Sequence, residues 1–178
     1  VLIEEKYARS MPGGIGFAKA AGNYGAALYP AKQAQDKGYH QLIWTDSMEH
    51  KYIEESGTMN VVFQINDVLI TPESSDTILS GITRRSLVEL AHSKGIAFVE
   101  RKITIKEIVD ALESGTLQDA FGAGTAATIA HIKTIGYRGK DYELPPMETR
   151  TLSISLAKEL NDIKRGVIQD PFGWNYSV

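Results

Sequence analysis

Hydrophobic and polar positions along this chain follow helical spacing in some stretches and strand spacing in others. Apolar residues recur at helical intervals in three stretches, which are Asn23–Lys37, Gly81–Lys94 and Thr149–Lys164. Gly38 and Gly95 would end the first two of these helices, and Pro30 should distort the first or mark a late start. The pattern Thr104-Ile-Lys-Glu107 is a capping box and predicts a fourth helix that reaches about Ser114.

Short apolar runs bounded by turn residues predict the strands. They cover residues 41–44, 52–55, 60–65, 68–71 and 97–101, with a turn at Gly57 and a hairpin turn at Asn66-Asp67. Ala120-Phe121 enters another strand, the stretch 125–135 is apolar and rich in small residues, and the stretch 136–144 suits an exposed hairpin. Strands and helices mix without a strict βαβ repeat. This order favours one mixed α/β (α+β) domain over residues 1–178 rather than a doubly wound sheet.

Composition narrows the possible functions. The chain has 178 residues, of which 43% are hydrophobic and 23% charged, and its net charge of −3 does not indicate binding to nucleic acid or to an anionic membrane. No apolar run approaches a membrane span and no signal peptide opens the chain. Cysteine is absent, so disulfides, thiolate catalysis and zinc–thiolate sites are excluded, and this absence fits a reducing cytoplasm. The four histidines have no partner at metal-ligand spacing, so no metal site is expected.

Candidate chemistry gathers around Lys19, in the run Gly14-Ile-Gly-Phe-Ala-Lys19-Ala-Ala-Gly22-Asn-Tyr24-Gly25. A lysine amine becomes a nucleophile, able to form Schiff bases with carbonyls, when a desolvated, charge-poor pocket lowers its pKa. Small neighbours let a flat ligand lie close to the backbone. A lysine in a glycine-rich stretch is more often a solvated loop residue. The interpretation of Lys19 as a cofactor site therefore depends on three further segments. They are residues 54–60, 79–85 and 121–126.

In order and spacing, these four segments resemble the branched-chain amino acid aminotransferases, which are fold-type IV pyridoxal-phosphate (PLP) enzymes. Lys-x-x-Gly-Asn-Tyr24 followed by Glu55-x-Gly-Thr-x-Asn60 is the specific part, and Gly-Ile-Thr-Arg84 and Gly-x-Gly-Thr-Ala126 add support. Ala21, in place of a glycine, is a mild departure. The resemblance runs from about Gly13 to the C-terminal helix. It implies the C-terminal large domain of this fold, a mixed sheet forming a pseudo-barrel with surrounding helices.

The resemblance also assigns roles to individual residues. Lys19 would form the Schiff base with PLP and then move a proton at the substrate Cα, while Tyr24 would hydrogen-bond the phenolic oxygen of the cofactor. Glu55 would lie beneath the pyridine nitrogen; neighbouring strand residues face opposite sides, so only one of Glu54 and Glu55 should point inward. The predicted phosphate ligands are Ile82, Thr83 and Thr125, and the predicted ligands of the substrate carboxylate are Thr58 and the backbone N–H of Ala126.

The position of Thr83 near a predicted helix start independently suits an anion, although such residues are also common as simple helix-start residues. Arg84 and Arg85 look like phosphate clamps. The phosphate arginine of the family lies upstream of the lysine, in a smaller N-terminal domain, so Arg84 and Arg85 are interpreted as surface or interface charges.

Members of the family are about twice as long as this chain. The resemblance therefore predicts that residues 1–178 are the C-terminal, cofactor-bearing half of a longer enzyme whose N-terminal half is missing here. The expected reaction is transamination of leucine, isoleucine and valine with 2-oxoglutarate, in a homodimer or a higher homo-oligomer. Without the upstream arginine and pocket wall, the isolated half is expected to bind PLP weakly and to turn over poorly.

Three alternatives remain open at this point. D-amino acid aminotransferase and aminodeoxychorismate lyase have the same fold type and use the same lysine and glutamate. A fragment or regulatory domain without its partner half would not be catalytic. A nucleotide-binding domain is a weaker alternative, because Gly14-Ile-Gly16 and Gly122-Ala-Gly124 each fail to complete the Gly-x-Gly-x-x-Gly motif.

Overall fold

A ten-stranded mixed sheet forms the centre of the fold in a computed structural model that describes residues 1–176. Its order is β10-β9-β1-β2-β3-β4-β5-β6, and β7 pairs with β4 and β8. The pairs β1–β2, β1–β9 and β5–β6 are parallel and the others antiparallel. The strands are β1 (Leu2–Ile3), β2 (Leu42–Thr45), β3 (Ile53–Ser56), β4 (Met59–Ile65), β5 (Val68–Thr71), β6 (Phe98–Glu100), β7 (Leu117–Gly124), β8 (Thr128–His131), β9 (Thr134–Tyr137) and β10 (Lys140–Glu143).

The four predicted helices are confirmed, with boundaries within two residues of those expected. They are α1 (Ala21–Asp36), α2 (Ile82–Ser93), α3 (Ile105–Glu113) and α4 (Thr151–Lys164), the last preceded by a 3-10 turn, η1 (Met147–Thr149). The capping box is also confirmed, because the Glu107 N–H donates to Thr104 Oγ1 at 3.0 Å. The expectation of a late start at Pro30 is wrong, because helix α1 continues through this residue, which is buried.

Two-residue turns fix the register of three hairpins. Gly57-Thr58 joins β3 to β4, and Asn66-Asp67 joins β4 to β5 with positive φ angles of 48° and 64°. Asn and Asp are among the non-glycine residues that tolerate this left-handed backbone best. The expected hairpin near the C-terminus is β9–β10. These confirmed turns place the end of β3 and the start of β4 side by side.

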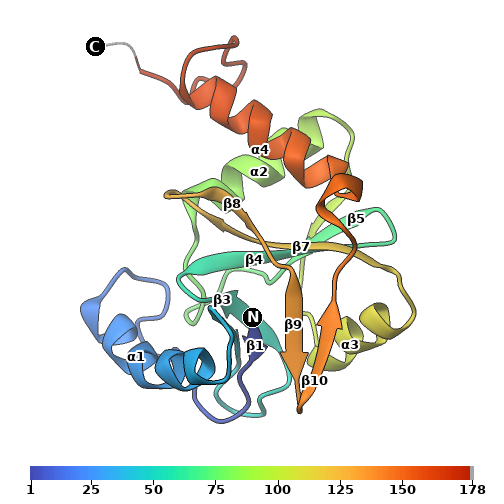
Figure 1. The fold of residues 1–178 in the computed structure, drawn as a ribbon. Coiled ribbons are helices and arrows are strands. Elements are labelled where there is room, and N and C mark those ends of the chain that lie inside the picture. The colour runs from blue at the N-terminus through green and yellow to red at the C-terminus, as the bar shows by residue number, and fades with distance from the viewer. Residues whose placement is uncertain (177–178) are drawn as a thin grey trace.

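The sheet is curled, and helices cover its faces (Figure 1). Strands β9 and β10 run across the direction of β4 and β7, while α2 and α4 pack on one side of β7 and β8. Along β4, Val61 and Phe63 face a core that includes residues of α3, whereas Val62 faces the core beneath α2 and α4. The sheet is therefore buried on both faces in its centre, which explains why its strands read as apolar runs.

Strand β1 is not among the elements that the sequence predicts. It has two residues, too few for a periodic pattern, yet it pairs in parallel with both β2 and β9. Its position depends on partners that lie about 40 and 134 residues further along the chain. Within residues 1–176, no helix has the length and the apolar character that crossing a membrane requires.

Candidate functional site

The eight residues singled out in the sequence line one cavity of about 570 Å³. They come from four segments: the loop before α1 with the start of that helix, the β3–β4 hairpin, the start of α2, and the turn between β7 and β8. The residues are Lys19, Tyr24, Glu55, Thr58, Ile82, Thr83, Thr125 and Ala126. The fold brings these eight residues together around one cavity, and their individual chemical roles stay predictions.

Lys19 lies in a loop that folds back on the start of α1. Asn23, the first residue of the Asn-Tyr pair, holds this loop, because its side-chain amide donates to the carbonyls of Ile15 at 2.8 Å and Ala18 at 3.0 Å. Lys19 and Tyr24 are both exposed at the edge of the cavity. The expected desolvated pocket around the lysine is thus not provided by the described residues, since none of them covers this edge.

Glu55 is the most constrained side chain of the cavity. It is 3% exposed, and its Oε1 accepts from the Leu79 N–H at 2.8 Å and from Asn60 Nδ2 at 3.4 Å. Its Oε2 lies 3.0 Å from Arg9 Nε. Burial raises the pKa of Glu55 to about 7, because desolvation outweighs the opposing effects of Arg9 and the Leu79 N–H. A buried acid that is only partly compensated suits a ligand that brings an N–H donor or a positive charge.

Glu54 points to the opposite face of the sheet, as the strand geometry predicts. Both glutamates are nevertheless buried. Glu54 is 6% exposed and accepts from Thr77 Oγ1 at 2.6 Å, and burial raises its pKa. The reason is that the segment before α2 covers this face of β3, which a local sequence pattern does not reveal.

The start of α2 forms the part of the cavity that suits an anion. Gly81 precedes the helix and no side chain caps the first turn, so the first backbone N–H groups have no intrahelical partner. A Cβ at Gly81 would clash with Asn60 Oδ1, so a larger residue there would displace the Asn60 side chain between the helix start and β4. Thr83 is buried and Ile82 exposed. Thr125 approaches the same cavity from the exposed β7–β8 turn.

Arg84 corrects one expectation. Its interpretation as a surface or interface charge is wrong, because it is 1% exposed, whereas Arg85 is exposed. Arg84 Nη1 donates to the Pro72 carbonyl at 2.8 Å, and Nη2 donates to Ser74 and lies 3.3 Å from Glu100. Its two Nη atoms therefore anchor the segment before α2, while the buried Nε has no hydrogen-bond partner.

Sequence reasoning misses Arg9 as a neighbour of the site. The signal available is weak: Arg9 is the one arginine that precedes Lys19 in the chain. The sequence also gives no indication that Asn60, which belongs to one of the motifs, contacts Glu55. Residues 1–176 contain no group of three or more histidine, cysteine, aspartate and glutamate residues placed to hold a metal ion.

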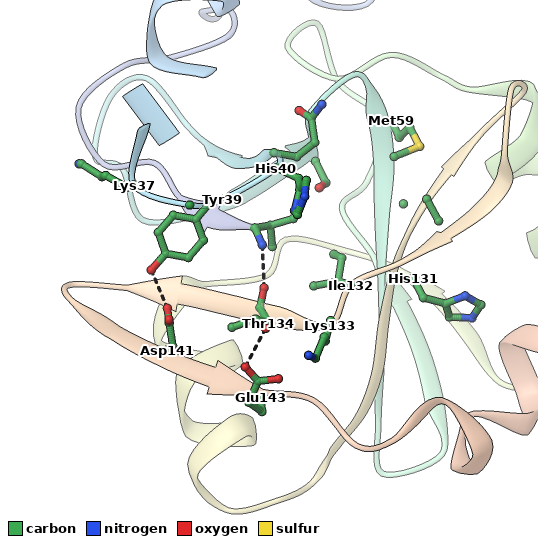
Figure 2. A pocket seen from close by; sticks show the side chains of 16 residues that line it. Lys37, Tyr39, His40, Met59, His131, Ile132, Lys133, Thr134, Asp141 and Glu143 are labelled. Carbon is green, nitrogen blue, oxygen red and sulfur yellow. Dashed lines mark hydrogen bonds between the residues drawn. The ribbon is translucent and has the colours of Figure 1, made fainter. Parts of the chain in front are cut away.

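A second cavity of about 550 Å³ lies near the start of β1 and shares Met59 with the first (Figure 2). Its charged groups do not converge on a common point. Asp141 accepts from Tyr39 Oη at 2.5 Å, and Glu143 accepts from Thr134 Oγ1 at 2.8 Å. The two acids are thus already engaged, and the chemistry points to the cavity of Lys19 and Glu55 instead.

We expect Glu55 to make stability depend on pH when no ligand fills the cavity. Because the pKa of Glu55 is raised from its ordinary value of 4.5 to about 7, the folded state holds the proton more tightly than the unfolded state. The stabilisation is complete below pH 4.5 and is lost as pH rises to about 7. Each pH unit is worth about 1.4 kcal/mol, so the loss is about 3 kcal/mol.

The measurement is urea-induced unfolding between about pH 4.5 and 8 without added cofactor, for wild type and Glu55→Gln. The stability of the variant relative to wild type should increase by about 3 kcal/mol over this range. Glu49→Gln, at an exposed position, is the control and should follow the wild type. If the unfolding free energies of Glu55→Gln and wild type changed in parallel with pH, the pKa of Glu55 would not be raised.

Comparisons with known proteins agree with this arrangement. The sequence profile of the family "Amino-transferase class IV" matches residues 16–135. A probable branched-chain-amino-acid aminotransferase of Staphylococcus aureus (strain N315) is 40% identical over 178 residues, which cover 100% of this chain and 50% of the relative. The chain thus spans about half the length of the curated relatives it matches.

Solved structures show the same fold. The branched-chain amino acid aminotransferase from Escherichia coli matches with a TM-score of 0.78 and 25% identity, over 98% of this chain and 55% of that one. An aminotransferase from Brucella abortus, bound to the cofactor PLP, matches with a TM-score of 0.72 and 22% identity, over 90% of this chain and 53% of that one. The mixed fold and the pseudo-barrel expectation are thereby confirmed.

Proposed function

The chain belongs to the amino-transferase class IV family, and from this premise we propose that it is the cofactor-bearing part of a PLP-dependent enzyme. The proposed reaction is transamination of the branched-chain L-amino acids leucine, isoleucine and valine with 2-oxoglutarate. The observation that carries the proposal is the convergence of Lys19, Glu55 and the start of α2 on one cavity. The name of the Staphylococcus aureus relative, at 40% identity, supports the choice of substrate.

The residues of the cavity fit PLP by their chemistry. Lys19 offers an amine for the cofactor aldehyde, and Tyr24 offers a hydroxyl for its phenolic oxygen. Glu55 is a buried, partly compensated acid, which suits the N–H of a protonated pyridine ring. Ile82, Thr83 and Thr125 would hold the phosphate at the uncapped start of α2 and at the β7–β8 turn.

The chemistry of the bound cofactor is that of an electron sink, which stabilises negative charge at the substrate Cα. The chain supplies the acid–base groups. The Lys19 amine would move a proton from the substrate Cα to C4′ of the cofactor in the first half of the cycle, and in the reverse direction in the second half. Glu55 would hold the proton on the ring nitrogen by charge pairing. Thr58 and the Ala126 N–H would bind the α-carboxylate and orient the substrate.

We further propose that residues 1–178 form one domain and that an upstream part of the same enzyme covers the open edge of the cavity. This proposal is supported by the comparison with the relatives, because the chain spans about half of their length. The exposed apolar residues near Lys19 and along α1 also suit a covering surface; they are Ile15, Phe17, Leu28 and Tyr29. A homodimer or higher homo-oligomer in the cytoplasm completes the proposal.

The test is a substrate panel with the full-length gene product that contains this chain. We expect kcat/KM for L-leucine, L-isoleucine and L-valine to exceed that for L-alanine by on the order of a hundredfold, because apolar pockets discriminate by about this factor. D-Alanine and aminodeoxychorismate test the alternative class IV activities. Preference for either of these substrates would replace the branched-chain proposal while keeping the family.

The 178-residue chain alone serves as the comparison in this test. It is expected to bind PLP weakly and to turn over poorly, since Lys19 and Tyr24 stay exposed without a cover. Equal activity of the chain and the full-length product would contradict the proposed upstream cover.

A further inference from the structure

Arg9 is a buried cation beside the cavity, held in one orientation by three partners. Its side chain is 8% exposed, and its Nε lies 3.0 Å from Glu55 Oε2. Its Nη2 donates to the carbonyls of Gly16, at 2.9 Å, and Thr77. Because the guanidinium is planar and its donors are fixed in a fork, these contacts determine where Nε points.

The contacts of Arg9 join the Lys19 loop to the carboxylate of Glu55. Gly16 belongs to the loop that carries Lys19, and a Cβ there would clash with Ser10 Oγ and with the Thr77 carbonyl. Thr77 lies two residues before Leu79, whose N–H holds the other oxygen of Glu55. The two oxygens of Glu55 thus have different partners on two sides: Oε1 accepts from the Leu79 N–H, and Oε2 forms an ion pair with Arg9.

Arg9 is also the positive charge that accompanies two buried acids. Besides Glu55, it acts on Glu54 on the other face of β3, where Thr77 accepts from Arg9 through its carbonyl and donates to Glu54 through its hydroxyl. Removing the arginine would take the close positive charge from both buried carboxyls, and buried carboxyls in that situation bind protons more tightly. Arg84 would still favour the ionised form of Glu55, and Glu54 would still oppose it.

We propose that Arg9 is the positioning residue that favours the ionised form of Glu55 and directs its carboxylate at the ring nitrogen of the cofactor. This inference rests on the proposed function, because it assigns Glu55 to that nitrogen. Without Arg9, the pKa of Glu55 would rise further, so Glu55 would pair less well as an anion with the ring nitrogen, and the ring would no longer be held in the protonated form. Arg9 is not among the residues that line the cavity, so it would act through Glu55.

The test compares the full-length gene product as wild type, Arg9→Gln, Arg9→Lys and Ser10→Ala, each loaded with PLP that carries ¹⁵N in the ring. The ¹⁵N chemical shift reports whether the ring nitrogen is protonated. We expect a protonated ring in wild type and Arg9→Lys, and an unprotonated ring in Arg9→Gln, with kcat reduced about tenfold to a hundredfold at nearly unchanged KM for leucine. Glutamine removes the charge and keeps one amide donor group on a shorter side chain, while lysine keeps the charge.

Ser10→Ala is the matched structural control. Ser10 Oγ donates to the same Thr77 carbonyl at 2.8 Å, so this variant removes an anchor of the same loop without changing the charge beside Glu55. It should keep the protonated ring and the wild-type kcat. A protonated ring in Arg9→Gln overturns the inference, and so does an equal change in Ser10→Ala.

Infrared titration of the Glu55 carboxyl without cofactor separates this inference from the proposed function. The signal is identified as the difference from Glu55→Gln, and it should move to higher pH in Arg9→Gln. If PLP fails to attach to wild-type protein, the proposed function fails, while the effect of Arg9 on Glu55 is still decided by this titration. An unmoved Glu55 titration in both Arg9 variants overturns the inference in either case.

Discussion

Lys19→Ala should abolish transamination by the full-length gene product, with a loss of kcat on the order of 10⁴-fold or more. The amine that is proposed to hold the cofactor aldehyde is also the group proposed to move the proton at the substrate Cα. Its removal therefore eliminates two functions at once, and no second lysine among the described residues lines the cavity of about 570 Å³. PLP binding should weaken but persist, because the groups proposed for the phosphate and ring nitrogen remain.

The measurement is leucine-dependent turnover together with peptide mapping after borohydride reduction, which should fix PLP on the peptide that contains Lys19. Lys32→Ala is the matched control, since Lys32 lies on α1 and forms an exposed ion pair with Asp36 at 2.5 Å. This variant should keep wild-type turnover and labelling. If Lys19→Ala retained the covalent label or most of its turnover, the assignment of the lysine would be wrong.

Much of the fold could be predicted, because residues close together in the sequence determine where its helices and turns form. The capping box at Thr104, the Asn66-Asp67 turn and the apolar faces of the helices each depend on residues within one or two turns of chain. The residues of the cavity are predicted in a different way. They belong to motifs whose order resembles a known family, and the structure brings these motifs together around one cavity.

The contacts between distant segments could not be predicted from the sequence. Arg9 and Glu55 are far apart in the chain, and neither has a pattern around it that indicates the other. The burial of Glu54 and Arg84 depends on the segment before α2, which packs beside both. A charged residue is interpreted as a surface residue until its partner is known, because most charged residues are exposed. The environment of the site is thus set by packing rather than by local propensity.

Trp44 illustrates how packing positions the site, since it connects α1, the sheet and the β3–β4 turn. It is 1% exposed, belongs to the cluster with Ala34 and Leu42, and donates from Nε1 to the Gly57 carbonyl at 3.0 Å. Trp44→Ala should lower the free energy of unfolding by about 3–5 kcal/mol, because it removes a large buried ring and leaves a cavity. Against a total of about 5–15 kcal/mol for a typical domain, this loss is severe.

Trp44→Phe separates the ring from the hydrogen bond. It keeps an aromatic ring in the cluster but leaves the Gly57 carbonyl without its donor, so we expect a cost of about 1–3 kcal/mol. Because Gly57 precedes Thr58 and follows the strand of Glu55, the loosened turn should also weaken PLP binding in the full-length gene product. Urea unfolding followed by circular dichroism and PLP titration measure the two effects. Equal losses of stability in the alanine and phenylalanine variants would contradict the dominant role of the ring and assign the effect to the hydrogen bond.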